Sequence, residues 1–435
     1  MNYLPNIIFA IALFFGIGYF IRNVKKLVRN IKLGKDKDVS DNKSQRWKNM
    51  AMIALGQSKM VKRPIAGFFH IIVYVGFVII NIEVLEIIID GLFGTHRVFS
   101  GMGNLYGFLI GSFEILAALV FVAVVVFWIR RNIIKIKRFM SSEMKGWPKT
   151  DGNVILYFEM VLMTLFLVMN ATDAEFQAMN SGNVISQFIA PLFSGFSENV
   201  LHFVERSAWW LHILGILVFL NYLYFSKHLH ILLAFPNTYY GNLNPKGQFS
   251  NNEAVTKEVM LMMDPNVDPF AVPAEGDNQQ MPEKFGASDV QDLSWVNLLN
   301  AYTCTECGRC TSECPANLTG KKLSPRKIMM DTRDRLVEVG NNIDANNGEF
   351  KDDGKQLLND YITKEELWAC TSCNACTEAC PVSIDPLNII MEMRRYLVME
   401  ESAAPMELNN MMTNIENNGA PWPYNQMDRL NWKNE

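Results

Sequence analysis

The eight cysteines of this 435-residue chain all lie between positions 304 and 380, in two groups of four with the same internal spacing. Each group reads Cys-x2-Cys-x2-Cys-x3-Cys-Pro, the run that binds [4Fe-4S] clusters in bacterial ferredoxins. In such runs the first three thiolates bind one cluster and the fourth reaches the other. The spacing therefore predicts two clusters, one held by Cys304, Cys307, Cys310 and Cys380 and the other by Cys370, Cys373, Cys376 and Cys314.

Zinc is the alternative occupant, because paired Cys-x2-Cys units also build zinc ribbons. We favour iron and sulfur, since three cysteines at two-residue intervals and a fourth before proline occur twice, with no cysteine left over. Ser324-Pro325 and Asp385-Pro386 each place a capping side chain before a proline, which predicts a helix start. We expect residues 295–400 to form a mainly α-helical dicluster ferredoxin domain.

Apolar runs long enough to cross a bilayer precede this domain. Five of them lie near residues 4–21, 65–89, 105–129, 153–171 and 208–226. The first has no basic residue before it and no cleavage pattern after it, so we expect a retained span rather than a signal peptide. Residues 185–203 are apolar but broken by Pro191 and Gly195, which predicts a short external or interfacial helix, with a sixth span as the alternative. Residues 1–230 should form an all-α bundle of five transmembrane helices.

Basic residues beside the spans predict the orientation of the chain. The first and third connections are rich in lysine and arginine. The second connection has one basic residue, Arg97, and the stretch 171–206 also has one, Arg206. By the positive-inside rule, the first and third connections are cytoplasmic. We therefore expect a multi-pass protein of the bacterial cell (inner) membrane, with its N-terminus outside and the ferredoxin domain in the cytoplasm.

The predicted topology gives each histidine a depth. His70 and His230 lie on facing helices at the same cytoplasmic level, which suits the two axial nitrogens of a haem b between the helices. His212 precedes His230 by five whole turns, so it shares a face with His230 near the external end if the helix is continuous. His212 would serve a second haem, for which the spacing demands no particular partner. The alternative is an interfacial role, which we expect for His228.

Glu83, Glu86 and Glu114 fall inside predicted spans, where ionisable side chains are costly enough to suggest a function. Glu83 and Glu86 lie in the outer half of the second span, and Glu114 lies in the outer half of the third. If a quinone exchanges protons near the external face, these carboxylates and His212 are the candidate partners. The alternative for Glu86 is proximity to the lipid headgroups.

Residues 231–294 are polar and contain six prolines, which predicts a cytoplasmic linker between the two parts. Residues 401–435 form a C-terminal tail. Basic residues of the ferredoxin domain either dock an acidic partner or, as we prefer, lie on solvated helix faces; they are Lys321, Lys322, Arg326, Lys327, Arg394 and Arg395. The net charge of −4 gives no reason to expect a nucleic-acid partner.

Taken together, these features resemble the membrane-bound iron–sulfur oxidoreductases related to heterodisulfide reductase. In that family a five-span cytochrome b, like the gamma subunit of respiratory nitrate reductase, is joined to a dicluster ferredoxin. The matching residues are His70, His212 and His230 with the adjoining SKHLHI, the run AYTCTECGRCTSECPA from Ala301, and ENNGAPWP from Glu416. The resemblance implies that His70 and His230 bind the cytoplasmic-side haem. The usual second ligand of the outer haem, the partner of His212, is missing here.

In related fused proteins, including oxidoreductases proposed to act between electron-transferring flavoprotein and menaquinone, cysteine-rich CCG domains follow the ferredoxin. The resemblance therefore implies a separate CCG subunit for this chain. We expect a membrane electron-transfer subunit of a quinone oxidoreductase complex. Electrons would pass between a cytoplasmic redox partner, of the CCG-domain or flavoprotein type, and the quinone pool through two [4Fe-4S] clusters and one or two haems b.

No nucleophile, nucleotide loop or flavin fingerprint is evident, so we expect substrate chemistry to reside in a partner. Two alternatives remain for the function. The first is a membrane-anchored docking ferredoxin without haem. The second is a redox-driven ion pump, for which Glu83, Glu86 and Glu114 are the only signal.

Overall fold

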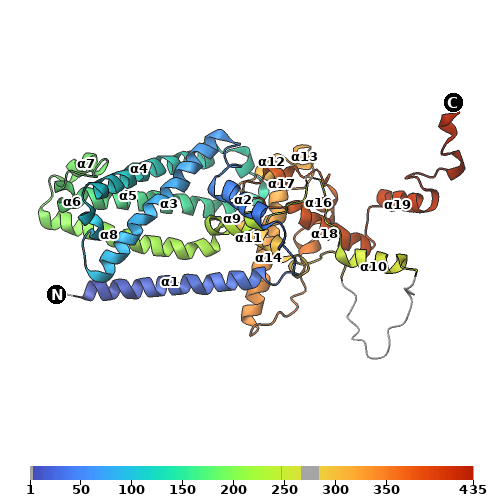
Figure 1. Cartoon of the computed structure of the whole chain (residues 1–435), viewed down its shortest axis with the longest axis horizontal. Coiled ribbons are helices and arrows are strands. Elements are labelled where there is room, and N and C mark those ends of the chain that lie inside the picture. Colours follow the sequence, from blue (N-terminus) through green and yellow to red (C-terminus); the bar gives the residue numbers. More distant parts are fainter. Residues whose placement is uncertain (1–2, 246, 266–283, 435) are drawn as a thin grey trace.

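The computed structural model describes residues 3–245, 247–265 and 284–434 (Figure 1). Five long helices carry the predicted apolar runs: α1 (Leu4–Ile31), α3 (Pro64–Phe93), α4 (Asn104–Asn132), α5 (Trp147–Thr172) and α8 (Glu198–Tyr222). Each is long and apolar enough to cross a membrane, α8 together with the 3₁₀ turn Leu223–Phe225. The prediction of five candidate spans is confirmed.

Local sequence signals account for the bounds of these helices. Proline stands in the first turn of α1, α3 and α5, where its missing N–H leaves no intrahelical bond unmade. α3 ends at Gly94, whose φ of 71° is the left-handed conformation that terminates many helices. The Gly94 N–H donates to the Asp90 carbonyl at 2.8 Å. The chain then turns into the Thr95–Arg97 segment.

The five helices form a bundle in which neighbours contact one another in the closed order α1, α3, α4, α5, α8 and back to α1. The bundle core contains Phe9, Phe113, Phe166 and Trp209, which are at most 7% exposed. Large apolar side chains such as Phe14 are instead 74% exposed on the outer surface. This distribution suits a bundle whose outer face contacts hydrocarbon rather than water.

The chain between α5 and α8 folds into short helices. α6 (Ala174–Ala178) is followed by α7 (Ser186–Ile189) and the 3₁₀ turn Ala190–Phe193, and the chain from Glu198 onward belongs to α8. The predicted short helix therefore covers only the first part of residues 185–203. Among the described residues, five helices are long and apolar enough to cross a membrane, and none of them lies between α5 and α8.

α8 does not continue to His230. It passes into 3₁₀ turns at Leu223–Phe225 and Lys227–Leu229, and α9 (His230–Tyr239) begins at the histidine itself. Between the turns Ser226 is extended, with ψ of 147°, and its hydroxyl accepts the His228 N–H at 3.0 Å. A serine cap starts a new turn in a new direction. The five-turn relation expected between His212 and His230 is therefore wrong.

Residues 284–400, called the cysteine domain below, lie at one end of the bundle (Figure 1). Their helices are α11 (Trp295–Thr303), α12 (Arg309–Ser312), α13 (Pro315–Leu318), α14 (Pro325–Ala345), α15 (Leu357–Asp360), α16 (Lys364–Trp368), α17 (Ala375–Ala379) and α18 (Pro386–Met399). Ser324 and Asp385 accept the backbone N–H groups of Lys327 and Asn388. Both predicted helix starts are confirmed, and the described part of this domain contains no strand.

The cysteine domain packs closely against the end of α1. Lys35 and Ser294 form an isolated parallel β-bridge. Gly34 permits this approach, because a Cβ there would lie 2.7 Å from the Leu293 carbonyl oxygen. Farther along, the Asn30 amide donates to the Tyr302 hydroxyl at 2.9 Å. The two parts of the chain are thus joined by packing and hydrogen bonds as well as by the backbone.

The region predicted as a linker is partly helical. α9 packs against α11 and against α2 (Lys43–Met50), and α10 (Glu253–Met263) follows farther along. The predicted linker residues 266–283 lie outside the described part of the chain. In the C-terminal tail, α19 (Met406–Asn418) extends away from the cysteine domain (Figure 1).

Candidate functional site

The first cysteine loop, residues 304–314, leaves α11 at Cys304. Two of its residues have left-handed backbones, Glu306 with φ of 53° and Gly308 with φ of 70°. Glycine is also required at 308 by space, because a Cβ would lie 2.5 Å from Nη1 of Arg326. Through these turns the loop folds back, and three of its cysteines line one small cavity: Cys304, Cys307 and Cys310.

The second cysteine loop, residues 370–380, repeats this conformation. Ser372 and Asn374 have φ values of 58° and 59°, and they stand two and four residues after the first cysteine, as Glu306 and Gly308 do. The short helices within the two loops, α12 (Arg309–Ser312) and α17 (Ala375–Ala379), pack against each other. The repeat in sequence is therefore also a repeat in backbone structure.

The two loops exchange their last cysteines. Cys380, from the second loop, lines a cavity of about 20 Å³ together with Cys304, Cys307 and Cys310. Burial raises the pKa of the Cys304 thiol to about 12 and that of Cys380 to about 11. Such thiols stay protonated at neutral pH unless a metal centre binds and stabilises their thiolates. Four converging sulfurs are the donor set that a [4Fe-4S] cluster requires.

The other four cysteines are Cys370, Cys373 and Cys376 from the second loop and Cys314 from the first. Burial raises the pKa of Cys370, and its neighbours Cys314 and Cys373 act in the same direction. The Ser372 N–H donates to Cys370 Sγ at 3.4 Å, as an N–H does to a thiolate in a cluster site. Cys373 is exposed, whereas none of the first four cysteines is, so the second set is open to solvent at this thiol and the first is more enclosed.

A buried ion pair joins the first cysteine loop to the bundle. Glu306, only 3% exposed, pairs with Lys227 and accepts from Arg333 Nη1 at 2.7 Å. Burial opposes ionisation of Glu306, but the two cations nevertheless lower its pKa. The backbone carbonyl of the same Lys227 lies 3.0 Å from Nδ1 of His230. One residue thus contacts both the cysteine loop and a predicted haem ligand.

Two buried arginines add further connections to the bundle. Arg309 donates to the Lys59 and Met60 carbonyls at 3.0 and 3.2 Å. Arg326, 0% exposed, donates to the Arg138 carbonyl at 2.6 Å and to Glu143 at 2.7 Å. The prediction that Arg326 lies on a solvated helix face is therefore wrong. Its guanidinium stabilises the contact between the third connection of the bundle and the cysteine domain.

We expect Glu306→Gln to destabilise the protein by about 3 kcal/mol, because it removes the buried carboxylate that Lys227 and Arg333 share. Among the carboxylates of the described residues, Lys227 then keeps only Asp151, at 3.6 Å, and Arg333 keeps only Asp334, at 2.9 Å. The matched control is Glu313→Gln, which removes a carboxylate that is 54% exposed and pairs with Arg63. That surface pair should contribute less than about 1 kcal/mol. Thermal unfolding of the two variants in detergent checks the difference. Equal losses of stability in the two variants would show that the buried ion pair at Glu306 stabilises the protein no more than an exposed ion pair does.

Three histidines gather at the end of the bundle that contacts the cysteine domain. The ring centroids of His70 and His230 are 6.5 Å apart, with planes inclined by 39°. Nδ1 of His70 is buried and has no hydrogen-bond partner in the described part of the chain. His228 packs 5.5 Å from His230 and 5.4 Å from Phe219, and desolvation lowers the pKa of His228 to about 3. All three imidazoles are thus held in a poorly solvated environment.

His212 lies elsewhere, in the middle of the bundle. It is 1% exposed, and its Nδ1 is 3.0 Å from the Leu162 carbonyl oxygen. Its ring packs 6.0 Å from Phe166. No second histidine ring contacts it among the residues that the structure describes. The structure therefore brings His70 and His230 together but leaves His212 apart from them.

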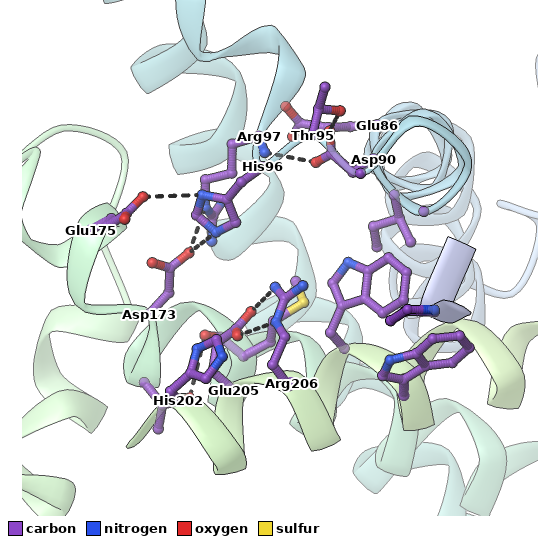
Figure 2. A pocket seen from close by; sticks show the side chains of 18 of the residues that line it. Glu86, Asp90, Thr95, His96, Arg97, Asp173, Glu175, His202, Glu205 and Arg206 are labelled. Atoms are coloured by element: carbon purple, nitrogen blue, oxygen red, sulfur yellow. Dashed lines mark hydrogen bonds and ion pairs between the residues drawn. The ribbon is translucent and has the colours of Figure 1, made fainter. Parts of the chain in front are cut away.

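The opposite end of the bundle contains a cavity of about 870 Å³, called the far cavity below (Figure 2). Residues of α1, α3, α5, α6 and α8 and of the segment 94–97 line it. Glu83 and Glu86 are among them. Oε2 of Glu83 has no hydrogen-bond partner in the described chain, whereas Glu86 accepts the Phe99 N–H at 2.8 Å. Two of the three predicted carboxylates therefore share one space.

Glu114 has a different environment. It is 0% exposed and does not line the far cavity. Its carboxylate accepts from the Asn170 amide at 3.0 Å and from the Ile185 and Ser186 N–H groups at 2.7 and 3.0 Å. These bonds pair the backbone N–H groups at the start of α7, which have no partner within that helix, and hold α7 against α4 and α5. Glu114 thus has a structural task that its position in a span did not indicate.

Several residues with prominent contacts in the structure had no role predicted from the sequence. Arg97 served only as the one basic residue of its connection, yet it is 7% exposed and donates to Asp173 at 2.8 Å. Lys227 adjoins the His-Leu-His run, and Glu306 stands between two cysteines. A charge beside predicted ligands was the available signal for both, but their pairing spans 79 residues and needed the fold.

Comparison with known proteins agrees with the cysteine geometry. Residues 303–384 match the family described as 4Fe-4S dicluster domain. A probable iron-sulfur-binding oxidoreductase, FadF, of Bacillus subtilis is 28% identical over 99% of this chain and 61% of the relative. An EtfAB:quinone oxidoreductase of Syntrophomonas wolfei is 25% identical over 91% of the chain and 55% of the relative.

A probable membrane-anchored ferredoxin of Chromohalobacter salexigens is 31% identical over 34% of this chain and 24% of the relative. No solved structure matches the chain. The chain spans only about 55–61% of the first two relatives. It carries a 4Fe-4S dicluster domain beside five candidate membrane spans, and along almost its whole length it is similar to iron–sulfur oxidoreductases.

Proposed function

We propose that the chain is the membrane electron-transfer subunit of a quinone oxidoreductase complex. Electrons pass between a cytoplasmic redox partner and the quinone pool through two [4Fe-4S] clusters and haem b. The observation that carries this proposal is the position of Lys227. Its side chain binds Glu306 in the first cysteine loop, and its carbonyl lies at Nδ1 of His230. Through Lys227, the proposed cluster site is connected to the proposed pair of haem ligands by direct contacts.

The two clusters are assigned by the exchanged cysteines. Cys304, Cys307, Cys310 and Cys380 hold the enclosed cluster, and Cys370, Cys373, Cys376 and Cys314 hold the exposed one. Shared lining of one cavity supports the first set, and the proximity of Cys314 to Cys370 supports the second. The match to the 4Fe-4S dicluster family favours iron and sulfur over zinc.

His70 and His230 suit the axial positions of haem b. With metal–nitrogen bonds of about 2 Å and a ring radius of roughly 1 Å, two axial imidazoles have centroids about 6 Å apart. The observed separation is 6.5 Å. His230 Nδ1 is within hydrogen-bond distance of the Lys227 carbonyl, a contact that fixes the tautomer and leaves Nε2 for a metal. Haem bound there would supply a one-electron carrier.

The arrangement gives the carriers an order. Arg309, beside Cys310, contacts Lys59 and Met60, and α3 begins four residues after Met60. His70 stands six residues into α3, a rise of about 9 Å. The enclosed cluster is therefore the one nearest the histidine pair, and the cluster with exposed Cys373 faces the partner. That partner, of the CCG-domain or flavoprotein type, carries out the substrate chemistry.

The quinone part of the proposal draws on the relatives and on the far cavity. The Syntrophomonas relative is named as a quinone oxidoreductase. Glu83 and Glu86 are the carboxylates that line the far cavity and would exchange protons with a bound quinone. The far cavity faces the external side of the membrane, and the cysteine domain lies in the cytoplasm. This orientation is the one predicted by the basic residues of the first and third connections. His212 is the residue available for a second, outer haem.

Haem and iron per chain in the detergent-purified protein test this function. We expect about one haem and about eight cluster irons. Dithionite should reduce both kinds of centre, and a soluble menaquinone analogue should then reoxidise the haem. Iron without haem would contradict the cytochrome and leave a ferredoxin on a membrane anchor, the function named for the Chromohalobacter relative. Haem that the quinone analogue fails to oxidise would contradict the quinone part alone.

A further inference from the structure

The far cavity has a marked excess of acidic groups. Seven carboxylates, two arginines and two histidines line it. The acidic lining residues are Glu83, Glu86, Asp90, Asp173, Glu175, Glu198 and Glu205. A concave surface with this balance attracts cations. Its chemistry therefore suggests a positively charged ligand.

Three of the lining residues converge in a pattern that suits a metal ion. His96, Asp173 and Glu205 each place one ligand atom within 4.8 Å of the others. His96 Nε2 lies 3.2 Å from Asp173 Oδ2, while its Nδ1 lies 3.3 Å from Glu175, which orients the ring (Figure 2). Two ligands of a tetrahedral zinc ion, at bond lengths of about 2.0 Å, are about 3.3 Å apart. The spacing thus fits without rearrangement of this pair.

The two carboxylates are already held in place from behind. Arg97 Nε donates to Asp173 at 2.8 Å, and Arg206 pairs with both carboxylate oxygens of Glu205 (Figure 2). Metal-binding carboxylates are commonly hydrogen-bonded in this way. The donors orient each group while leaving lone pairs for an ion.

A second, independent observation points to a ligand in the same cavity. Glu83 is 3% exposed and lines the cavity, and its Oε2 has no hydrogen-bond partner among the described residues. A buried carboxylate oxygen without a donor is costly, and native proteins rarely leave one so. A cation in the cavity, through the water molecules that it binds, would supply the missing partner.

We propose that His96, Asp173 and Glu205 bind one divalent transition-metal ion of the zinc type at the far cavity. One imidazole and two carboxylates are ligands that zinc accepts, with water completing the coordination. The ion would join the segment after α3, the end of α5 and α8, which are far apart in sequence. The inference does not rest on the electron-transfer function, because it involves neither the cysteines nor His70 and His230.

Equilibrium dialysis of the full chain in detergent against buffered Zn²⁺, with zinc and iron measured together, tests this site. Full iron content ensures that the cysteines are occupied and that the protein is folded. We expect about one zinc per chain in the native protein, and binding weakened about tenfold or more in His96→Ala and in Glu205→Gln. His202→Ala is the matched control, because His202 lines the same cavity outside the triad.

Retention of zinc by the His202 variant and its loss from both triad variants, with unchanged iron, would establish the site. Failure of the native protein to bind zinc would overturn it. Equal binding by all four proteins would also overturn it, because the zinc would then be adventitious. A weakening in His202→Ala as large as in the triad variants would show a diffuse acidic attraction instead of a defined site.

Discussion

Cys380→Ala should abolish the enclosed cluster, although Cys380 lies in the second cysteine loop. Its thiol lines the cavity formed by the first three cysteines, 70 to 76 residues earlier in the chain. A [4Fe-4S] cluster that lacks one of its four thiolates is labile, so we expect cluster iron to fall from about eight to about four per chain. The electron paramagnetic resonance spectrum of the reduced protein should lose one of its two signals.

Two matched variants show which cluster has been lost. Cys307→Ala removes a ligand of the enclosed cluster, and Cys373→Ala removes one of the exposed cluster. The spectrum of Cys380→Ala should match that of Cys307→Ala, whereas Cys314→Ala should match Cys373→Ala. The reverse matching would contradict the exchange of cysteines and mean that each loop binds its own cluster.

His230→Ala should remove the haem completely and leave the iron of the clusters unchanged. We expect that His228 cannot take the place of His230 beside the haem. The plane of its ring is inclined by 88° to that of His230, and the ring packs against Phe219. We expect His70→Ala to have the same effect. The pyridine haemochrome assay should therefore give about one haem in the native protein and about none in either variant.

The controls for the haem prediction are His228→Ala and His212→Ala, which should retain the haem bound by His70 and His230. Full haem content in the His70→Ala variant would contradict the ligand pair. A native content of about two haems, with one lost in His212→Ala, would instead assign His212 to an outer haem with a partner of another residue type.

The parts of the structure that the sequence predicted are those decided by local patterns. The five apolar runs correspond to the five long helices. The thickness of the hydrocarbon layer and the rise per residue of a helix together fix the smallest number of apolar residues that can cross a membrane. The caps at Ser324 and Asp385 depend on contacts three residues away, so their sequence signal suffices. The repeated cysteine spacing likewise predicted the dicluster domain that the family comparison supports.

The predictions failed where contacts between distant residues decide the structure. At the helix break, Ser226 begins the run SKHLHI, and the next backbone N–H, that of Lys227, donates to Asp151, 76 residues away in the chain. Arg326 looks like a surface residue of α14, but the third connection of the bundle covers it. From its place in a span, Glu114 was a candidate for proton transfer. In the structure its carboxylate instead accepts hydrogen bonds from backbone N–H groups 71 and 72 residues away.

The many connections between the bundle and the cysteine domain have a consequence for how electrons reach the membrane. Tyr302, Glu306, Arg309 and Arg326 contact four separate segments of the bundle, so no hinge is left between the two parts. Mobile carriers shuttle between donor and acceptor and need such a hinge. Under the proposed function, the domain would conduct electrons without moving. The current would then be controlled by the arrival and departure of the redox partner at the exposed thiol of Cys373.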